Sequence, residues 1–130
     1  IEEVLEAPPS AACVALLDPV FVCRFKKELR GTEVVVSAWR NTCRGVRTRS
    51  VTFVQAIASR FTPVSSTQAD ESQQSTALAD GSLVLQTQVR LADVPFASYF
   101  CVHTKWHFRP HAGGTMLVIS TEVCSSGKAT

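Results

Sequence analysis

Residues 100–108, with the sequence FCVHTKWHF, alternate between two kinds of side chain. The even positions are apolar, aromatic or β-branched: Phe100, Val102, Thr104, Trp106 and Phe108. The odd positions are Cys101, His103, Lys105 and His107. Because successive side chains of a β-strand point to opposite faces, this period of two predicts a half-buried strand with one aromatic-rich face turned inward. A face this apolar must be covered, and what covers it constrains both the fold and the function.

Further strands are predicted by the same kind of pattern elsewhere in the chain. Residues 83–91 place Leu83, Leu85, Thr87, Val89 and Leu91 on one side. Strand patterns also occupy residues 32–37, 45–55 and 116–124, and a fainter one lies in the Ser-, Thr- and Gln-rich residues 65–76. Asp80-Gly81 predicts a hairpin turn. A turn is also predicted at 110–114, a basic loop at 40–44 and an apolar, irregular loop at 56–63.

Two helices are predicted near the start of the chain, after an acidic segment at 1–9 that ends in two prolines and is typical of a linker. Ser10 can cap a helix through residue 17, and Asp18-Pro19 is typical of a second helix start. The second helix is expected to bury four apolar side chains, Phe21, Val22, Phe25 and Leu29. Gly31 is expected to end it in a left-handed conformation. Two helices followed by about six antiparallel strands predict an α+β fold.

The chain is long enough for one domain with a real core, since it has 130 residues, of which 45% are hydrophobic. No apolar run approaches the roughly 18 residues of a membrane span. The first residues lack an initiator methionine and a basic signal region, so we expect a domain from a longer protein. Five widely spaced cysteines without a Cys-x-x-Cys pair favour free thiols in a reducing compartment.

Catalytic and metal-binding signatures are weak in this sequence. His103, His107 and His111 recur every four residues, but on a strand such a step spans about 13 Å, too far for a shared metal ion. No nucleophile elbow, phosphate-binding loop or zinc-protease motif is present. We therefore expect no enzyme, no cofactor and no metal.

The order of elements and several short motifs resemble the VASt domain, the START-like lipid-binding module of the Lam and Aster sterol transporters. Residues 49–53 (RSVTF) are similar to a strand motif of that family, and residues 93–95 (DVP) with Tyr99-Phe100 match its most specific block. Val102, Thr104 and Trp106 extend this block. Residues 121–123 and Gly127-Lys128 resemble the closing strand of the family. The likeness runs from about Ala12 onward, so the expected domain occupies residues 10–130.

The resemblance implies a helix-grip fold, in which a curved antiparallel sheet and N-terminal helices enclose a sterol-sized cavity with a long C-terminal helix. The chain ends at Thr130, where that helix would begin. It also implies a lipid carrier without covalent chemistry, facing the cytosol. Such a carrier would be tethered to an intracellular membrane such as the endoplasmic reticulum by other parts of the protein, a GRAM domain and a membrane anchor among them.

On this fold, the inward side chains of three strands are the expected cavity lining: Leu83, Leu85, Thr87, Val89, Phe100, Val102, Thr104, Trp106, Phe108, Leu117 and Ile119. The polar Thr87 and Thr104 favour a cavity, because ligand sites are mostly apolar with a few placed polar groups. The alternative is a structural or protein-interaction domain of the same fold, whose aromatic side chains fill the interior.

Two further surfaces are expected to serve a lipid carrier. The loop at 56–63 lies at the position of the family's lid, although it lacks the usual Gly-Pro-Lys ending, and its Ile57 and Phe61 would touch the ligand or the bilayer. Arg40, Arg44, Arg47 and Arg49 form a basic cluster expected to dock on anionic membranes. Nucleic acid is a poorer partner, because Trp39 and Phe53 are the only aromatic residues interleaved with the arginines.

Overall fold

A computed structural model describes residues 1–57, 65–92 and 100–125, and within them the chain forms an α+β fold of two helices and one eight-stranded sheet. The helices are α1 (Pro9–Leu17) and α2 (Pro19–Glu28). The strands are β1 (Glu2–Leu5), β2 (Gly31–Val36), β3 (Arg40–Cys43), β4 (Val46–Ala56), β5 (Ser66–Ala77), β6 (Leu83–Leu91), β7 (Phe100–His111) and β8 (Gly114–Ser125).

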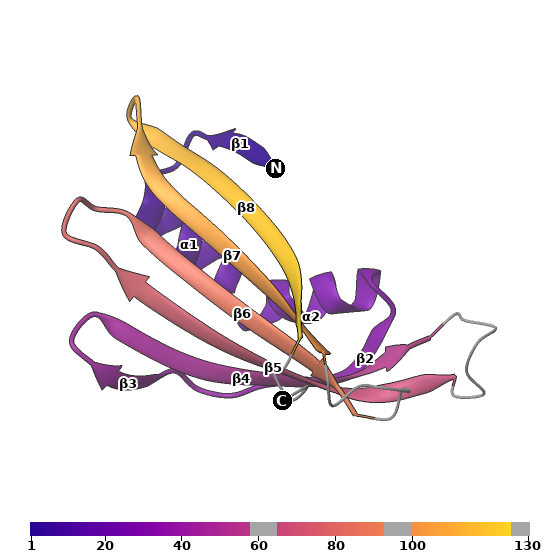
Figure 1. Cartoon of the computed structure of the whole chain (residues 1–130). Helices are drawn as coiled ribbons and strands as arrows, with labels where there is room; N and C mark the ends of the chain where they lie inside the picture. Colours follow the sequence, from indigo (N-terminus) through magenta and orange to yellow (C-terminus); the bar gives the residue numbers. More distant parts are fainter. Residues whose placement is uncertain (58–64, 93–99, 126–130) are drawn as a thin grey trace.

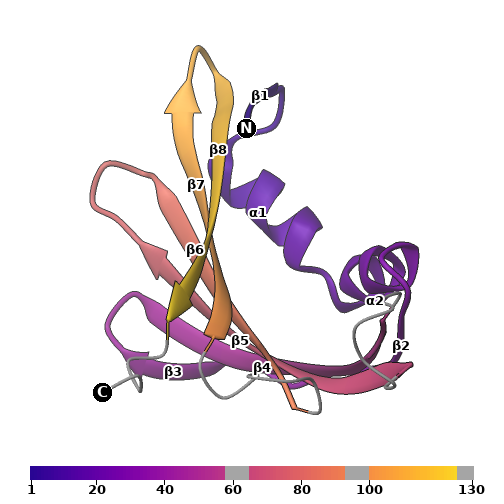
Figure 2. The ribbon, with the colours of Figure 1, turned by 45° about the vertical axis from the view of Figure 1, so that its right-hand side comes forward.

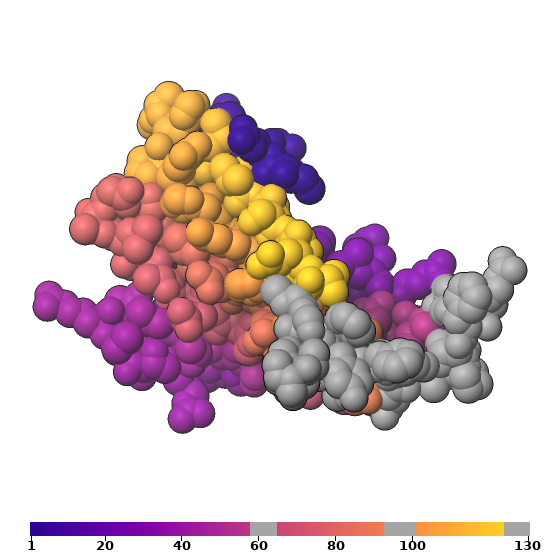
Figure 3. All heavy atoms as spheres, viewed as in Figure 1, coloured from indigo at the N-terminus to yellow at the C-terminus, as the bar shows by residue number. Residues whose placement is uncertain are grey.

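The sheet is antiparallel throughout, with the strand order β1-β8-β7-β6-β5-β4-β2 and with β3 paired to β4. It is strongly curved, and both helices lie on its concave side (Figures 1 and 2). The space-filling view, taken as in Figure 1, shows the strands covering the opposite, convex face with the helices behind them (Figure 3). Both helices therefore cover the concave face, and the strands form the convex one (Figures 2 and 3).

Each helix packs a separate apolar cluster onto one half of the sheet. Ala12, Cys13 and Leu17 of α1 pack with Leu85, Phe108 and Leu117 of β6–β8. Val22 of α2 packs with Val51 and Phe53 of β4 and with Ala69 of β5. The middle of the concave face therefore lies between two cores rather than within one.

The start of α2 is as the sequence predicts, because the Asp18 carboxylate accepts the N–H of Val20 at 2.8 Å. The end of α2 differs from the prediction, because the left-handed residue is Arg30, with φ of 67°, and Gly31 already belongs to β2. Gly31 is needed for space instead: a Cβ there would lie 3.0 Å from the Lys26 carbonyl oxygen and 3.2 Å from the Phe53 ring. Ser10 also does not cap α1, which begins at Pro9 without a side-chain cap.

Two predicted loops are wrong, because each contains a strand that the side-chain pattern does not reveal. Residues 1–9, expected to be a linker, contain β1, and residues 40–44, expected to be a basic loop, contain β3. Both strands are almost wholly exposed edges, so backbone pairing holds them without an inward apolar face. The turn expected at 110–114 narrows to Ala112 and Gly113, with φ of 46° and 84°, as two-residue hairpins require. With β1 and β3 added, the sheet has eight strands rather than the expected six.

Close contact between β1 and the start of β8 gives a first testable prediction. A Cβ on Gly114 would lie 2.2 Å from the Leu5 carbonyl oxygen, so Gly114→Ala must push β1 off the sheet. We expect a loss of about 1–3 kcal/mol of unfolding free energy, measured by chemical denaturation. The matched control is Gly113→Ala, where nothing lies within 4 Å of the new Cβ and only the positive φ of 84° is strained. Equal losses in the two variants would contradict the pairing of β1 with β8.

Candidate functional site

The register of the sheet carries inward side chains into rows that cross the concave face. Leu85, Trp106 and Ile119 form an apolar row on β6, β7 and β8. The next row is Thr87, Thr104 and Thr121, and the row after it is Val89, Val102 and Val123. The Thr104 and Thr121 hydroxyl oxygens lie 3.2 Å apart, within hydrogen-bond distance. A polar row thus runs between two apolar ones.

A cavity of about 370 Å³ lies over these rows and under the helices. From the sheet it is lined by Leu85, Thr87, Val89, Thr104, Trp106, Ile119 and Thr121, and from the helical side by Leu16, Leu17, Phe21, Val22, Phe25 and Leu29. Phe21 and Phe25 stack with ring centroids 6.1 Å apart. This volume falls within the range of about 300–1,000 Å³ typical of small-molecule sites.

A buried polar network forms one side of this cavity. The Lys26 ammonium of α2 lies 2.5 Å from Glu71 Oε1 of β5. The Gln73 amide donates a hydrogen bond to the other Glu71 oxygen, and Arg49 Nε donates to Gln73 Oε1 at 2.6 Å. Arg49, Glu71 and Gln73 are each only 5% exposed. The network therefore fixes a charged chain inside the concave face, and it ties α2 to the centre of the sheet.

Arg49 leads into a second cavity, of about 500 Å³, between the α1–α2 junction and β4. The guanidinium carbons of Arg49 and Arg47 lie 4.4 and 4.9 Å from the centre of the Trp39 ring, which also lines this cavity. Burial lowers the pKa of Arg49 from its ordinary value and Arg47 lowers it further, whereas the neighbouring Glu71 raises it. The Arg49 side chain is thus a buried cation held between an aromatic ring and an amide.

This placement corrects the assignment of Arg49 to a membrane-docking surface. A side chain that is 5% exposed and bonded within the sheet cannot reach a bilayer. Arg40, Arg44 and Arg47 are exposed. The docking role of these three stays a prediction.

The other predicted site residues do not all reach a cavity. Phe108 and Leu117 are 0% and 5% exposed in the apolar cluster beneath α1, and Leu83 packs beside them and lines the second cavity. Val102 shares the inward face but is 38% exposed. Ile57 is half-buried, and its N–H donates to the Ser65 carbonyl at 2.9 Å. The side chain of Phe100 and all of Phe61 lie outside the described residues.

Several residues at the cavity escaped the sequence analysis. Phe21, Phe25 and Leu29 were expected to be buried, yet they are 40%, 40% and 52% exposed and line the cavity. Lys26, Glu71 and Gln73 were not identified at all. A signal for Glu71 and Gln73 exists in β5, whose inward positions are mostly polar although alternate residues are buried.

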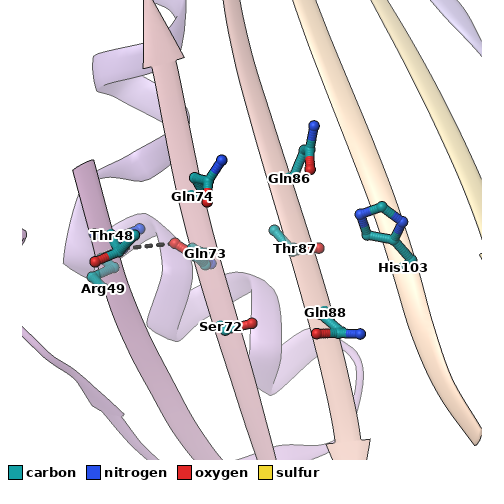
Figure 4. A pocket seen from close by; sticks show the side chains of 9 residues that line it. All are labelled: Thr48, Arg49, Ser72, Gln73, Gln74, Gln86, Thr87, Gln88 and His103. Atoms are coloured by element: carbon teal, nitrogen blue, oxygen red, sulfur yellow. Dashed lines mark hydrogen bonds between the residues drawn. The ribbon is translucent and has the colours of Figure 1, made fainter. Parts of the chain in front are cut away.

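The convex face is polar and carries a separate hollow of about 200 Å³. In Figure 4, which looks onto that face with the helices behind, side chains from β4 to β7 stand over it, among them Gln74, Gln86, Gln88 and His103. His103 lies 3.7 Å from Glu122. Within the described ranges, no group of three or more His, Cys, Asp or Glu side chains could hold a metal ion. In the same part of the chain, no helix is long and apolar enough to cross a membrane.

The curved sheet, the covering helices and the mostly apolar cavity together define a ligand-binding α+β domain. Residues 1–129 match the model of the VASt family, described as the VAD1 Analog of StAR-related lipid transfer domain. The chain belongs to this family of START-like lipid-binding domains. A comparison with curated proteins finds no match.

Cys13 provides a chemical test of the second cavity. Its side chain is 4% exposed in the lining, and burial raises the pKa of its thiol, an effect that nearby Arg47 and Arg49 partly offset. Because the thiolate is the reactive form, we expect iodoacetamide at pH 8 to modify Cys13 at least about tenfold more slowly than the exposed Cys43. The Cys13 rate should go on rising at higher pH, as a raised pKa requires. Timed alkylation with peptide mass spectrometry measures both rates, and equal rates at pH 8 would show that Cys13 is not enclosed.

Proposed function

We propose that this domain takes up a sterol in the cavity of about 370 Å³ and carries it between membranes at contact sites. The observation that carries the proposal is the row Thr87, Thr104 and Thr121, which lies at the cavity wall between the apolar row of Leu85, Trp106 and Ile119 and the row from which Val89 lines the cavity. A sterol is a rigid apolar body with one hydroxyl group. The rows match this chemistry, because threonine hydroxyls both donate and accept hydrogen bonds while the flanking rows cover the rings.

The affinity of such a site comes from apolar burial, with no covalent step. Each Å² of sterol surface removed from water contributes about 25 cal/mol, so several hundred Å² supply several kcal/mol. The hydroxyl must be hydrogen-bonded, because burying it without a partner costs about 1–3 kcal/mol in proteins. Leu85, Trp106 and Ile119 provide the apolar contact, and the threonine row provides the partner.

The exposed apolar side chains of α2 support release and uptake at a membrane. Phe21, Phe25 and Leu29 line the cavity and also meet solvent, so they form an apolar rim between the ligand and the outside. The helix-grip arrangement, in which a further helix completes the cavity, belongs to the same proposal. The proposal also includes a position on the cytosolic side of an intracellular membrane such as the endoplasmic reticulum, with tethering through other domains.

A structural or protein-interaction domain of this fold, with a filled interior, is the competing function. The cavity over the described strands favours the lipid carrier. Filling that space with a larger side chain distinguishes the two functions. It should block lipid uptake by a carrier, whereas an interaction domain does not need the space.

Filling the cavity is the direct test of sterol uptake. Thr104 lies in the polar row and is half-buried, so Thr104→Trp should both occupy the space and remove the hydroxyl. We expect at least a tenfold loss of uptake of a fluorescent sterol from vesicles, with circular dichroism and melting temperature near those of the wild type. The matched control is Lys105→Trp, one residue along β7 on the exposed opposite face, which should keep uptake. Unchanged uptake in folded Thr104→Trp protein would place the sterol elsewhere.

Membrane docking is tested at the arginines that the fold leaves exposed. Arg40 lies in β3 and Arg44 directly follows it. A basic residue near an anionic surface contributes about 1 kcal/mol, so Arg40→Glu with Arg44→Glu should weaken binding to phosphatidylserine vesicles at least about tenfold. Added salt should weaken wild-type binding toward the level of the variant.

The control for docking keeps the same net charge change at other exposed sites, with Arg90→Glu and Arg109→Glu. Vesicle co-sedimentation at low and high salt measures both variants. Equal losses in the two would mean that net charge alone, and not the β3 surface, attracts the protein to the membrane.

A further inference from the structure

The second cavity contains a buried cation whose hydrogen bonds are incomplete. Arg49 Nε is bonded to Gln73, but Arg49 Nη2 is buried and has no hydrogen-bond partner within the described part of the chain. An unpaired buried donor on a charged group is costly, because it has lost water without gaining an acceptor. A retained cost of this kind points to an acceptor that arrives from outside.

The charges around this cavity favour an anionic acceptor. Arg47 and Arg49 both line it, and among the described residues of the lining the one carboxylate is Asp18, which accepts the N–H of Val20 at the start of α2. Glu71, an acid that interacts electrostatically with Arg49, is already engaged by Lys26 and Gln73. Two guanidinium groups beside Trp39 therefore line the cavity, and the Asp18 carboxylate in the same lining already accepts a backbone N–H.

The geometry also favours a planar anion. A guanidinium group binds carboxylates through two parallel hydrogen bonds, and stacking on an aromatic ring limits the directions in which it can point. Both arginines lie within 4.9 Å of the centre of the Trp39 ring, so their donors are oriented before any ligand binds.

The rest of the lining is apolar and fits a hydrocarbon chain. Val14 of α1 is 70% exposed and lines this cavity together with Leu17, Pro19 and Leu83. An inorganic anion would leave these side chains uncovered, and a sterol would leave Arg49 without its anion. A molecule with a carboxylate head and an apolar tail satisfies both halves.

We propose that the cavity of about 500 Å³ between the α1–α2 junction and β4 binds a single-chain fatty carboxylate, with its head group on Arg49 and Arg47 and its tail along Val14, Leu17 and Leu83. This site is distinct from the proposed sterol cavity, although Leu17 and Arg49's partner Gln73 border on the latter. Binding of a fatty carboxylate at this cavity does not depend on whether the other cavity binds a sterol.

The two tryptophans of the chain allow the sites to be measured separately, because Trp39 lines this cavity and Trp106 lines the other. In a Trp106→Phe variant, titration with decanoate should change the Trp39 fluorescence saturably. Decan-1-ol, which has the same tail without the charge, should bind at least tenfold more weakly. Acetate, which has the head without the tail, should not compete at equal concentration. Decanoate should also slow the alkylation of Cys13.

Substitutions then assign the head group contact. Arg47→Gln removes an exposed guanidinium and should weaken decanoate about tenfold while leaving decan-1-ol unchanged. Arg49→Lys keeps the charge but loses the paired donors, and it should also weaken decanoate. Arg40→Gln, on the exposed edge strand outside the lining, is the control and should change nothing. If Arg49→Lys does not fold, Arg47→Gln alone decides the assignment.

The proposal is overturned if decanoate and decan-1-ol bind equally, if neither binds, or if folded Arg47→Gln protein binds decanoate as the wild type does. None of these outcomes affects sterol uptake, which is followed through Trp106 in a Trp39→Phe variant. A failure at one cavity is therefore separable from a failure at the other.

Discussion

The arrangement of the concave face depends on the ion pair between Lys26 and Glu71, at 2.5 Å. It joins α2 to β5, an inner strand of the sheet, and its carboxylate also accepts the Gln73 amide that positions Arg49. Removing one member of a buried pair typically costs about 3–5 kcal/mol, because the other charge stays behind without a partner. The pair thus fixes the height of α2 above the sheet, and with it the size of the cavity that Phe21 and Phe25 border.

A sheet that keeps charged and amide side chains on its inner face gives up part of the apolar burial that stabilises most domains. On β5 the buried inward residues include Glu71, Gln73 and Ser75, where a packed core would carry Val, Ile or Leu. Stability comes instead from the two clusters on either side, around Phe108 under α1 and around Phe53 under α2. The cavity beside Trp106 lies between the two clusters, since residues of both line it.

The sequence predicted the strands that have a clear period of two, because side-chain alternation and burial coincide there. The inward faces of β6, β7 and β8 follow from this alternation. It places Leu83, Leu85 and Thr87 on one face of β6, and Thr104 and Trp106 on one face of β7. The strands β1 and β3 could not be predicted in this way, since they are edges held by backbone hydrogen bonds and show no inward face. The sequence also contains a signal for the burial of Arg49. Arg49 shares the inward face of its strand with Val51 and Phe53. A charged residue beside two core residues is either paired inside the fold or a sign that the assumed strand register is wrong.

What the pattern of one strand cannot give is which polar side chains meet across the sheet. Arg49 and Gln73 are direct neighbours only because β4 pairs with β5 in one register, and Gln73 is next to Thr87 only because β5 pairs with β6 in another. The row continues through Thr104 to Thr121, so one line of polar side chains crosses five strands, from a guanidinium at one end to hydroxyl groups at the other. Its charged end borders the cavity beside Trp39, and its neutral end borders the cavity beside Trp106. Since an anion needs the charge and a sterol hydroxyl needs only a neutral partner, a single row across the sheet accounts for the different ligands that we propose for the two cavities.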